Sequence, residues 1–130
     1  MKKLLVIFFL LTITVFTQSD FEDRVQDGIK QIYNIKFDDA ERTFRNLIAD
    51  YPDHPSGRFF LAMIDWWKIL LELDNEDRDD IFFQKLEDVI FQCDQILKKD
   101  KSNVDALFFK GGAIGFRGRL RALRESWLKA

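Results

Sequence analysis

The chain has 130 residues and a formal net charge of −2, with 47% apolar and 32% charged residues. Its length leaves room for one small domain, and its composition excludes a low-complexity chain. The near-neutral charge argues against nucleic acid as a partner. Valine and threonine are sparse after the first 20 residues, which favours helices over strands.

Residues 1–19 have the layout of a secretory signal peptide. Two lysines precede an apolar run at residues 4–16, and small residues stand three and one positions before a cleavage point ahead of Asp20. The run is shorter than the roughly 20 residues that a membrane span requires. We therefore predict that the chain is exported, to the bacterial periplasm or beyond, with an uncleaved anchor as the alternative.

A first helix is predicted from Asp20 to Tyr33. Its apolar residues recur at spacings of four, four and three and define one face: Phe21, Val25, Ile29 and Ile32. Gly28 lies in the middle of this pattern, where glycine costs about 1 kcal/mol relative to alanine. We expect another helix to approach closely at that point.

A second helix is predicted after a short polar break, ending at Pro52, which cannot continue it. Asp38 and Glu41 have the spacing of a capping box and mark its start. The apolar face of this helix has five members: Ala40, Phe44, Leu47, Ile48 and Tyr51.

Residues 21–54 resemble a tetratricopeptide repeat (TPR), which is a pair of antiparallel helices of about 34 residues. Four residues carry the resemblance, at the separations of the family pattern: Gly28, Ala40, Phe44 and Pro52. Leu47 occupies the slot for a small residue between Phe44 and Pro52, and Arg24 and Gln31 stand where the pattern has tryptophan and tyrosine. The resemblance implies that the four matching residues and Leu47 pack the two helices together and turn the chain into the next repeat.

The second unit spans residues 55–101 and contains an acidic insertion at 72–80. The stretch from Pro55 to Leu73 is apolar nearly all round, so it is either buried on several sides or offers a hydrophobic surface. Asp79 or Asp80 is expected to cap the next helix, Ile81 to Lys99. The insertion lacks the glycine and the ligand spacing of a calcium loop, so we expect no metal there.

The third unit, residues 102–130, is predicted to be incomplete. A capping-box spacing from Ser102 to Asp105 opens a glycine-rich helix, Gly118 marks a turn, and Arg119 begins a last helix. We expect the arginines near this helix to be solvated or paired with acids, with binding to a membrane surface as the alternative. The sequence stops inside this last helix with no polar capping helix after it, which predicts a fragment of a longer array, with packing of the helix on a partner as the alternative.

The predicted fold is therefore all-α, with antiparallel helix pairs stacked as a TPR-like α-solenoid of about two and a half repeats. The predicted organisation is a signal peptide at 1–19 and a repeat domain at 20–130. Within that domain the repeats lie near 21–54, 55–101 and 102–130.

No catalytic constellation is evident in the sequence. It contains one histidine and one cysteine; His54 in a turn is expected to cap or to face solvent, and Cys93 to act as a small buried hydrophobe. A triad or a multi-histidine metal site needs more partners than these. We predict a protein that is not an enzyme and that has no cofactor and no metal.

The TPR resemblance implies instead a scaffold that binds a protein or peptide partner. Its groove would be lined by six residues in particular: Tyr33, Phe59, Met63, Trp66, Trp67 and Phe108. The aromatic set from Phe59 to Trp67 could equally fill the core. The open last repeat also allows self-association. The alternative function is a membrane-associated assembly factor that uses an uncleaved N-terminal anchor and the basic last helix.

Overall fold

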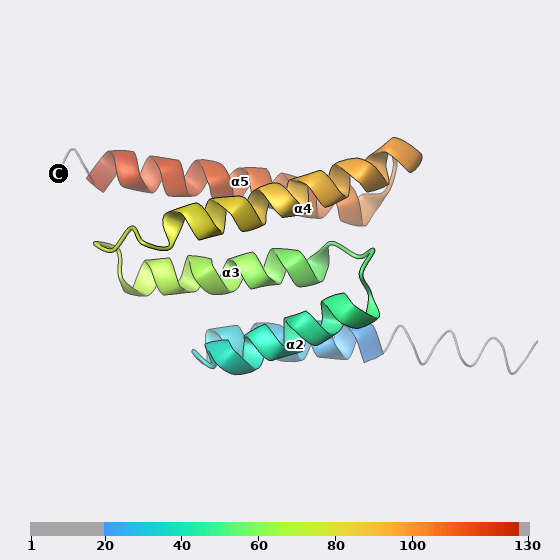
Figure 1. The fold of residues 1–130 in the computed structure, drawn as a ribbon, viewed down its shortest axis with the longest axis horizontal. Helices are drawn as coiled ribbons and strands as arrows, with labels where there is room; N and C mark the ends of the chain where they lie inside the picture. Colours follow the sequence, from blue (N-terminus) through green and yellow to red (C-terminus); the bar gives the residue numbers. More distant parts are fainter. Residues whose placement is uncertain (1–19, 128–130) are drawn as a thin grey trace, which may run out of the picture.

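The computed structural model describes residues 20–127, and within that range the protein is all-α, as predicted. The first helix spans residues 20–33. It is followed by α2 (Phe37–Asp50), α3 (Ser56–Leu71), α4 (Asp79–Lys99) and α5 (Val104–Trp127). Consecutive helices run antiparallel, as the order of colours along the chain shows (Figure 1). The expected signal peptide at 1–19 lies outside the described residues.

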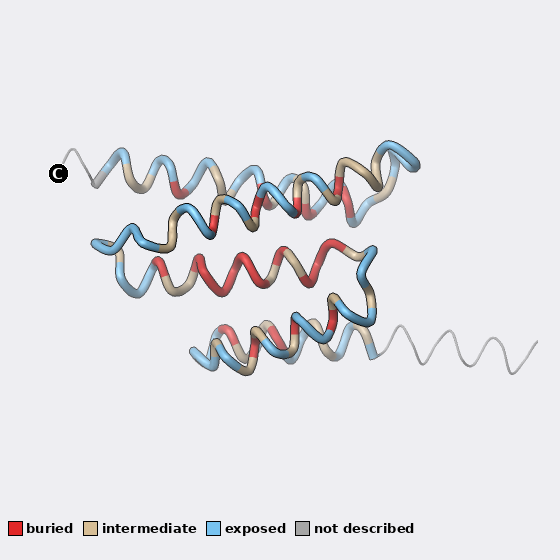
Figure 2. The backbone as a smooth tube through the Cα atoms, viewed as in Figure 1, coloured by how far each residue is buried: buried red, intermediate tan, exposed pale blue. Residues whose placement is uncertain are grey.

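The helix α3 forms the centre of the domain. It packs against α2 on one side and α4 on the other, and it also touches α5. Buried residues follow one another along almost its whole length (Figure 2), because neighbouring helices cover several of its faces. The buried Asp65 of α3 is neutralised by α4, where Lys85 donates a hydrogen bond to its carboxylate. This contact explains how one acid is accommodated in an otherwise apolar helix.

The first helix and α2 meet at Gly28. A Cβ atom added to Gly28 would lie 2.3 Å from the Phe44 ring, which is itself fully buried. Ala40 and Leu47 of α2 are buried beside it. The absence of a side chain at Gly28 is therefore what lets the two helices approach each other.

The predicted capping residues Asp38 and Ser102 are both wrong. α2 begins at Phe37, its N-cap residue Lys36 makes no side-chain cap bond, and Glu41 instead accepts a hydrogen bond from Arg45 at 2.9 Å. At the start of α5, Asn103 Oδ1 accepts from the Ala106 amide at 2.9 Å. Several polar residues stand near each start, and the backbone geometry selects which of them can cap.

The predicted cap of α4 is also wrong. The helix begins at Asp79, and its N-cap residue Arg78 makes no side-chain cap bond. The Asp79 carboxylate is used elsewhere, because it pairs with Arg124 of α5.

The predicted turn at Gly118 is wrong as well. α5 is a single helix of 24 residues that continues through Gly118. The buried residues Ala106, Phe109, Ala113 and Leu120 form one stripe along it. The α5 helix continues through Gly118 because the free energy gained by burying Leu120 exceeds the cost of a helical glycine, about 1 kcal/mol. The described chain therefore holds two helix pairs and one long fifth helix in place of an incomplete third pair.

Candidate interaction surface

Exposed apolar side chains lie at the C-terminal ends of the first helix and of α3, and one ring contact joins the two ends. Tyr33 is 68%, Ile35 59% and Leu71 55% exposed, and Leu70 is 36% exposed. The rings of Tyr33 and Trp67 meet edge to face with centroids 5.4 Å apart. Trp67, Leu70 and Leu71 share one face of α3 because they are three and four positions apart. We call these five residues the end patch.

Ile35 in the end patch has an unusual backbone conformation. Its φ is +59°, the only positive φ of a non-glycine residue in the range 20–127. It terminates the first helix in a Schellman motif, in which the Ile35 amide donates to Ile32 O and the Lys36 amide donates to Gln31 O, both at 2.9 Å. Glycine is the usual residue at this position, and a left-handed conformation costs other residues about 1–2 kcal/mol.

Neither backbone preference nor core packing accounts for isoleucine at position 35. Its backbone conformation disfavours a β-branched side chain, and more than half of that side chain faces solvent. Strain of this kind is found at functional sites, and clustered exposed apolar residues mark interaction surfaces. Both observations therefore identify the end patch as a candidate binding surface.

The six residues predicted to line a groove lie in three different places. Phe59, Met63 and Trp66 are only 6–7% exposed and belong to the core. Tyr33 and Trp67 lie in the end patch. Phe108 is 69% exposed on α5. For most of the aromatic set between Phe59 and Trp67, the structure thus shows the core placement.

The burial of this aromatic set follows from the central position of α3. Phe59 packs against Phe109 and Phe116 of α5, with ring centroids 5.2 and 6.1 Å away. Trp66 packs against Phe116 and against Phe82 of α4, at 5.3 and 5.8 Å. The helices α4 and α5 therefore cover the aromatic face of α3, which the sequence alone could assign either to the core or to a groove.

Three members of the end patch were missed in the sequence. Leu70 and Leu71 end a helix that is apolar on every side, so the pattern could not say which positions stay uncovered. Ile35 lies in a short connection that reads as a polar break. The signal that could have found it is an isoleucine directly after a helix, where glycine or asparagine is common.

Apart from the end patch, the described chain has an open cleft of about 780 Å³. It lies between the α2–α3 turn, α4 and the α4–α5 turn. Pro52 O accepts hydrogen bonds at 2.9 Å from both Arg58 and Gln92, which tie the turn to α3 and α4. His54 Nε2 lies 3.5 Å from an Asp105 carboxylate oxygen. Several polar groups of the cleft thus bind one another, and both signs of charge are present in its lining.

Metal binding and thiol chemistry can be assessed within the described residues. No group of three His, Cys, Asp or Glu side chains within residues 20–127 is placed to hold a metal ion. Cys93 is fully buried, and this burial raises the pKa of its thiol to about 11. At neutral pH this buried thiol is therefore protonated.

The arginines of α5 have partners within the chain. Arg117 pairs with Glu87, Arg119 lies 5.8 Å above the Trp66 ring, and Arg121 lies 5.6 Å from the Phe83 ring. No helix in the described part of the chain is long and apolar enough to cross a membrane.

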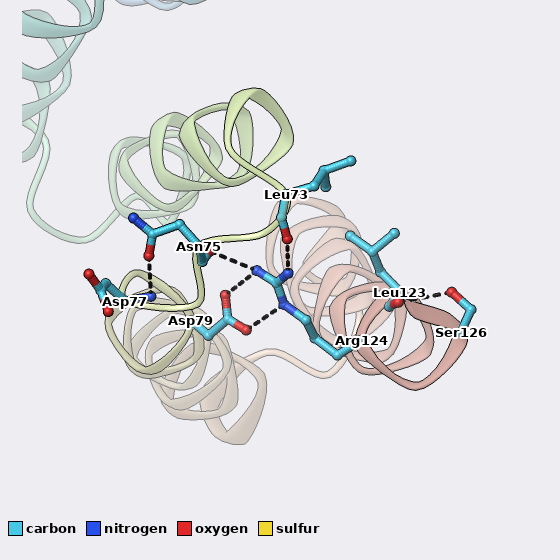
Figure 3. A network of polar contacts seen from close by, with 7 residues as sticks. All are labelled: Leu73, Asn75, Asp77, Asp79, Leu123, Arg124 and Ser126. Atoms are coloured by element: carbon cyan, nitrogen blue, oxygen red, sulfur yellow. Dashed lines mark hydrogen bonds and ion pairs between the residues drawn. The ribbon is translucent and has the colours of Figure 1, made fainter. Parts of the chain in front are cut away.

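Arg124 holds the acidic loop between α3 and α4 in place. It forms a two-pronged ion pair with Asp79, at 2.8 Å on each prong, and donates to the carbonyl oxygens of Leu73 and Asn75 (Figure 3). The hydrogen bond to Asp79 raises the pKa of Arg124. The side chains of this ion pair are only 12% and 13% exposed, so the pair is a structural clamp.

Comparison of the chain with protein-family models, curated protein sequences and solved structures gives no match. The choice of a function therefore depends on the residues and their geometry.

Proposed function

We propose that the chain is a non-catalytic protein–protein interaction scaffold of the TPR type, exported to the bacterial cell envelope. In this proposal the end patch is the surface that contacts a protein or peptide partner, and residues 1–19 are the export signal.

The helix pairs support the TPR-like arrangement. Gly28 of the first pair accommodates Phe44 of α2, at the separation that the TPR pattern has between its small and aromatic residues. Ala62 follows Gly28 by one repeat length and is also fully buried, in the first helix of the second pair. Both pairs thus place a small residue at the corresponding position.

The observation that carries the binding role is the strained, exposed isoleucine in the end patch. A conformation that costs about 1–2 kcal/mol is kept at a position where the side chain faces solvent. Contact with a partner would repay this cost, since an isoleucine buried at an interface gains hydrophobic free energy that glycine cannot provide.

The alternative role, a membrane-associated assembly factor, has less support. It needs a basic face on the last helix that is free to meet anionic lipid. The arginines of α5 are instead engaged with acidic and aromatic side chains of α3 and α4 and of the acidic loop.

Site-specific photo-cross-linking tests the proposal. Benzoyl-phenylalanine is placed at Tyr33, Phe91 or Phe108 of the full chain in its native host. These three aromatic residues are equally exposed, at 68%, 66% and 69%, but they lie in the end patch, in the cleft and on α5. We expect Tyr33 to yield an adduct with another protein and Phe91 to yield none. An adduct from Phe91 together with none from Tyr33 would move the binding surface to the cleft.

A further inference from the structure

The outward face of α5 is apolar and open. Val104 is 76%, Phe108 69%, Leu107 50% and Ile114 42% exposed. Helical periodicity aligns six residues on the side opposite the buried stripe: Val104, Phe108, Gly111, Gly115, Gly118 and Ala122. Contiguous exposed apolar residues of this kind mark an interface.

Three of the four glycines of α5 differ from the other glycines of the described chain. Cβ atoms added at Gly28 and Gly57 would lie 2.3 and 2.7 Å from side-chain atoms of α2. At Gly112 the nearest atom would be 3.0 Å away, on the Phe59 ring. At Gly111, Gly115 and Gly118 a Cβ would meet nothing within 4 Å.

The three outward glycines therefore serve no packing contact within the described chain. Glycine inside a helix is destabilising relative to alanine, and here nothing within the fold compensates. Their shared face, flanked by large exposed apolar residues, fits the close approach of a helix from outside.

We propose that this face docks onto the same face of a second copy of the chain, with the two α5 helices antiparallel. A two-fold axis midway between Gly111 and Gly115 sets the register. Phe108 of each copy then lies opposite Gly118 of the other, and Val104 opposite Ala122. The large residues at one end of the face thus meet the small residues at its other end.

The charges beside this face favour the same pairing. Asp105, which is 64% exposed, and Arg119 both flank the face on the side of α3: Asp105 lies near His54, and Arg119 lies over Trp66. In the antiparallel dimer, the two-fold axis places the α3 sides of both copies on the same side of the interface. Asp105 of each copy then lies near Arg119 of the other. A parallel two-fold arrangement would place the α3 sides of the two copies on opposite sides of the interface, so neither of these ion pairs could form. The occupant that matches the face in both shape and charge is therefore a second copy.

A charge exchange tests this docking. In the Asp105→Arg dimer, two arginine–arginine contacts replace the two intermolecular ion pairs. In the Arg119→Asp dimer, two aspartate–aspartate contacts replace them. An equimolar mixture of the two variants restores both attractive contacts. Sedimentation equilibrium of the full chain measures the dissociation constant of the dimer. We expect a value on the order of 10–100 μM because the interface is small.

We expect each single variant to dimerise about ten-fold or more weakly than the wild type, and their mixture to recover wild-type association as a heterodimer. The matched controls Asp27→Arg and Arg42→Asp make the same charge changes at exposed sites off α5 and should leave association unchanged. Far-UV circular dichroism verifies that each variant is folded.

Gly115→Leu provides a second, independent variant. A Cβ atom added at Gly115 meets no neighbouring helix or side chain within 4 Å, so we expect a folded monomer and loss of any double-mass cross-link from Phe108. A wild-type chain that stays monomeric at about 1 mM would overturn the proposal. So would single charge variants that associate as tightly as the wild type. Because the end patch uses other residues, neither result bears on the cross-link from Tyr33.

Discussion

Replacement of Ile35 separates the free energy of folding from the proposed binding role. Ile35→Ala removes most of the side chain but keeps the Cβ atom in the left-handed conformation, whereas Ile35→Gly removes that atom as well. Relative to the alanine variant, the glycine variant is relieved of about 1–2 kcal/mol of strain. It loses about 0.5–1 kcal/mol through the greater freedom of glycine in the unfolded chain.

We therefore expect Ile35→Gly to be more stable than Ile35→Ala by about 0.7 kcal/mol, the middle of a range of about 0–1.5 kcal/mol. For a domain of this size the gain corresponds to about 2–6 °C in Tm. Urea and thermal unfolding followed by helical circular dichroism measure both quantities. The matched control is Ala49→Gly, at an exposed position in the last turn of α2, where the same change should lower the stability by about 0.5–1 kcal/mol.

The yield of the Tyr33 cross-link and the stability of the chain should change in opposite directions. Ile35→Gly removes an exposed apolar anchor from the end patch, so we expect the Tyr33 cross-link to fall while stability is kept or gained. The reasoning is refuted if Ile35→Gly proves less stable than Ile35→Ala, because position 35 then carries no left-handed strain. It also fails if the cross-link persists unchanged in Ile35→Gly.

Four further changes test the packing. Trp66→Ala should lower the free energy of unfolding by about 3–5 kcal/mol, because a buried indole is lost; a loss below about 1 kcal/mol in urea unfolding would contradict the core placement. Gly28→Ala should cost about 1–3 kcal/mol by overpacking, whereas Gly115→Ala, in dilute monomer, should gain up to about 1 kcal/mol; equal effects would refute the contrast between these two glycines. Arg124→Met should cost about 1–3 kcal/mol, since it leaves a mostly buried carboxylate without its partner, and increased proteolysis of the acidic loop would accompany the loss. The Cys93 thiol, with a pKa of about 11, should react with Ellman's reagent at pH 8 only as fast as the chain unfolds, and rapid labelling without urea would exclude the buried site.

The helices could be predicted from the sequence where periodicity and helix-ending residues agreed. The spacing of Phe21, Val25, Ile29 and Ile32 marks the first helix, and Pro52 marks the end of the second. These signals are local, so they hold whatever the helices later pack against. Helix starts were less certain, because neighbouring polar residues compete to cap, and the backbone decides between them.

Long-range packing decided what periodicity could not. Trp66 and Trp67 are adjacent in a helix that is apolar on all sides, yet Trp66 is buried and Trp67 lies in the end patch. Only the positions of α4 and α5 distinguish the two. Gly118 reads as a turn in isolation, but burial of Leu120 keeps α5 helical beyond it.

The candidate surface was the least predictable part of the chain. Tyr33 and Trp67 were predicted to contact a partner, but through a groove formed jointly with residues that are buried in the structure. The conformation of Ile35 depends on a helix ending that has no glycine, and no apolar pattern in the sequence reports a positive φ.

Hydrogen–deuterium exchange of the chain, with and without the protein that Tyr33 captures, tests the central claim most directly. We predict that added partner slows exchange at residues 33–36 and 67–72, where the end patch lies, and leaves the cleft segments 52–58 and 88–100 unchanged. Slowed exchange confined to the cleft segments, with none at the end patch, would contradict the account.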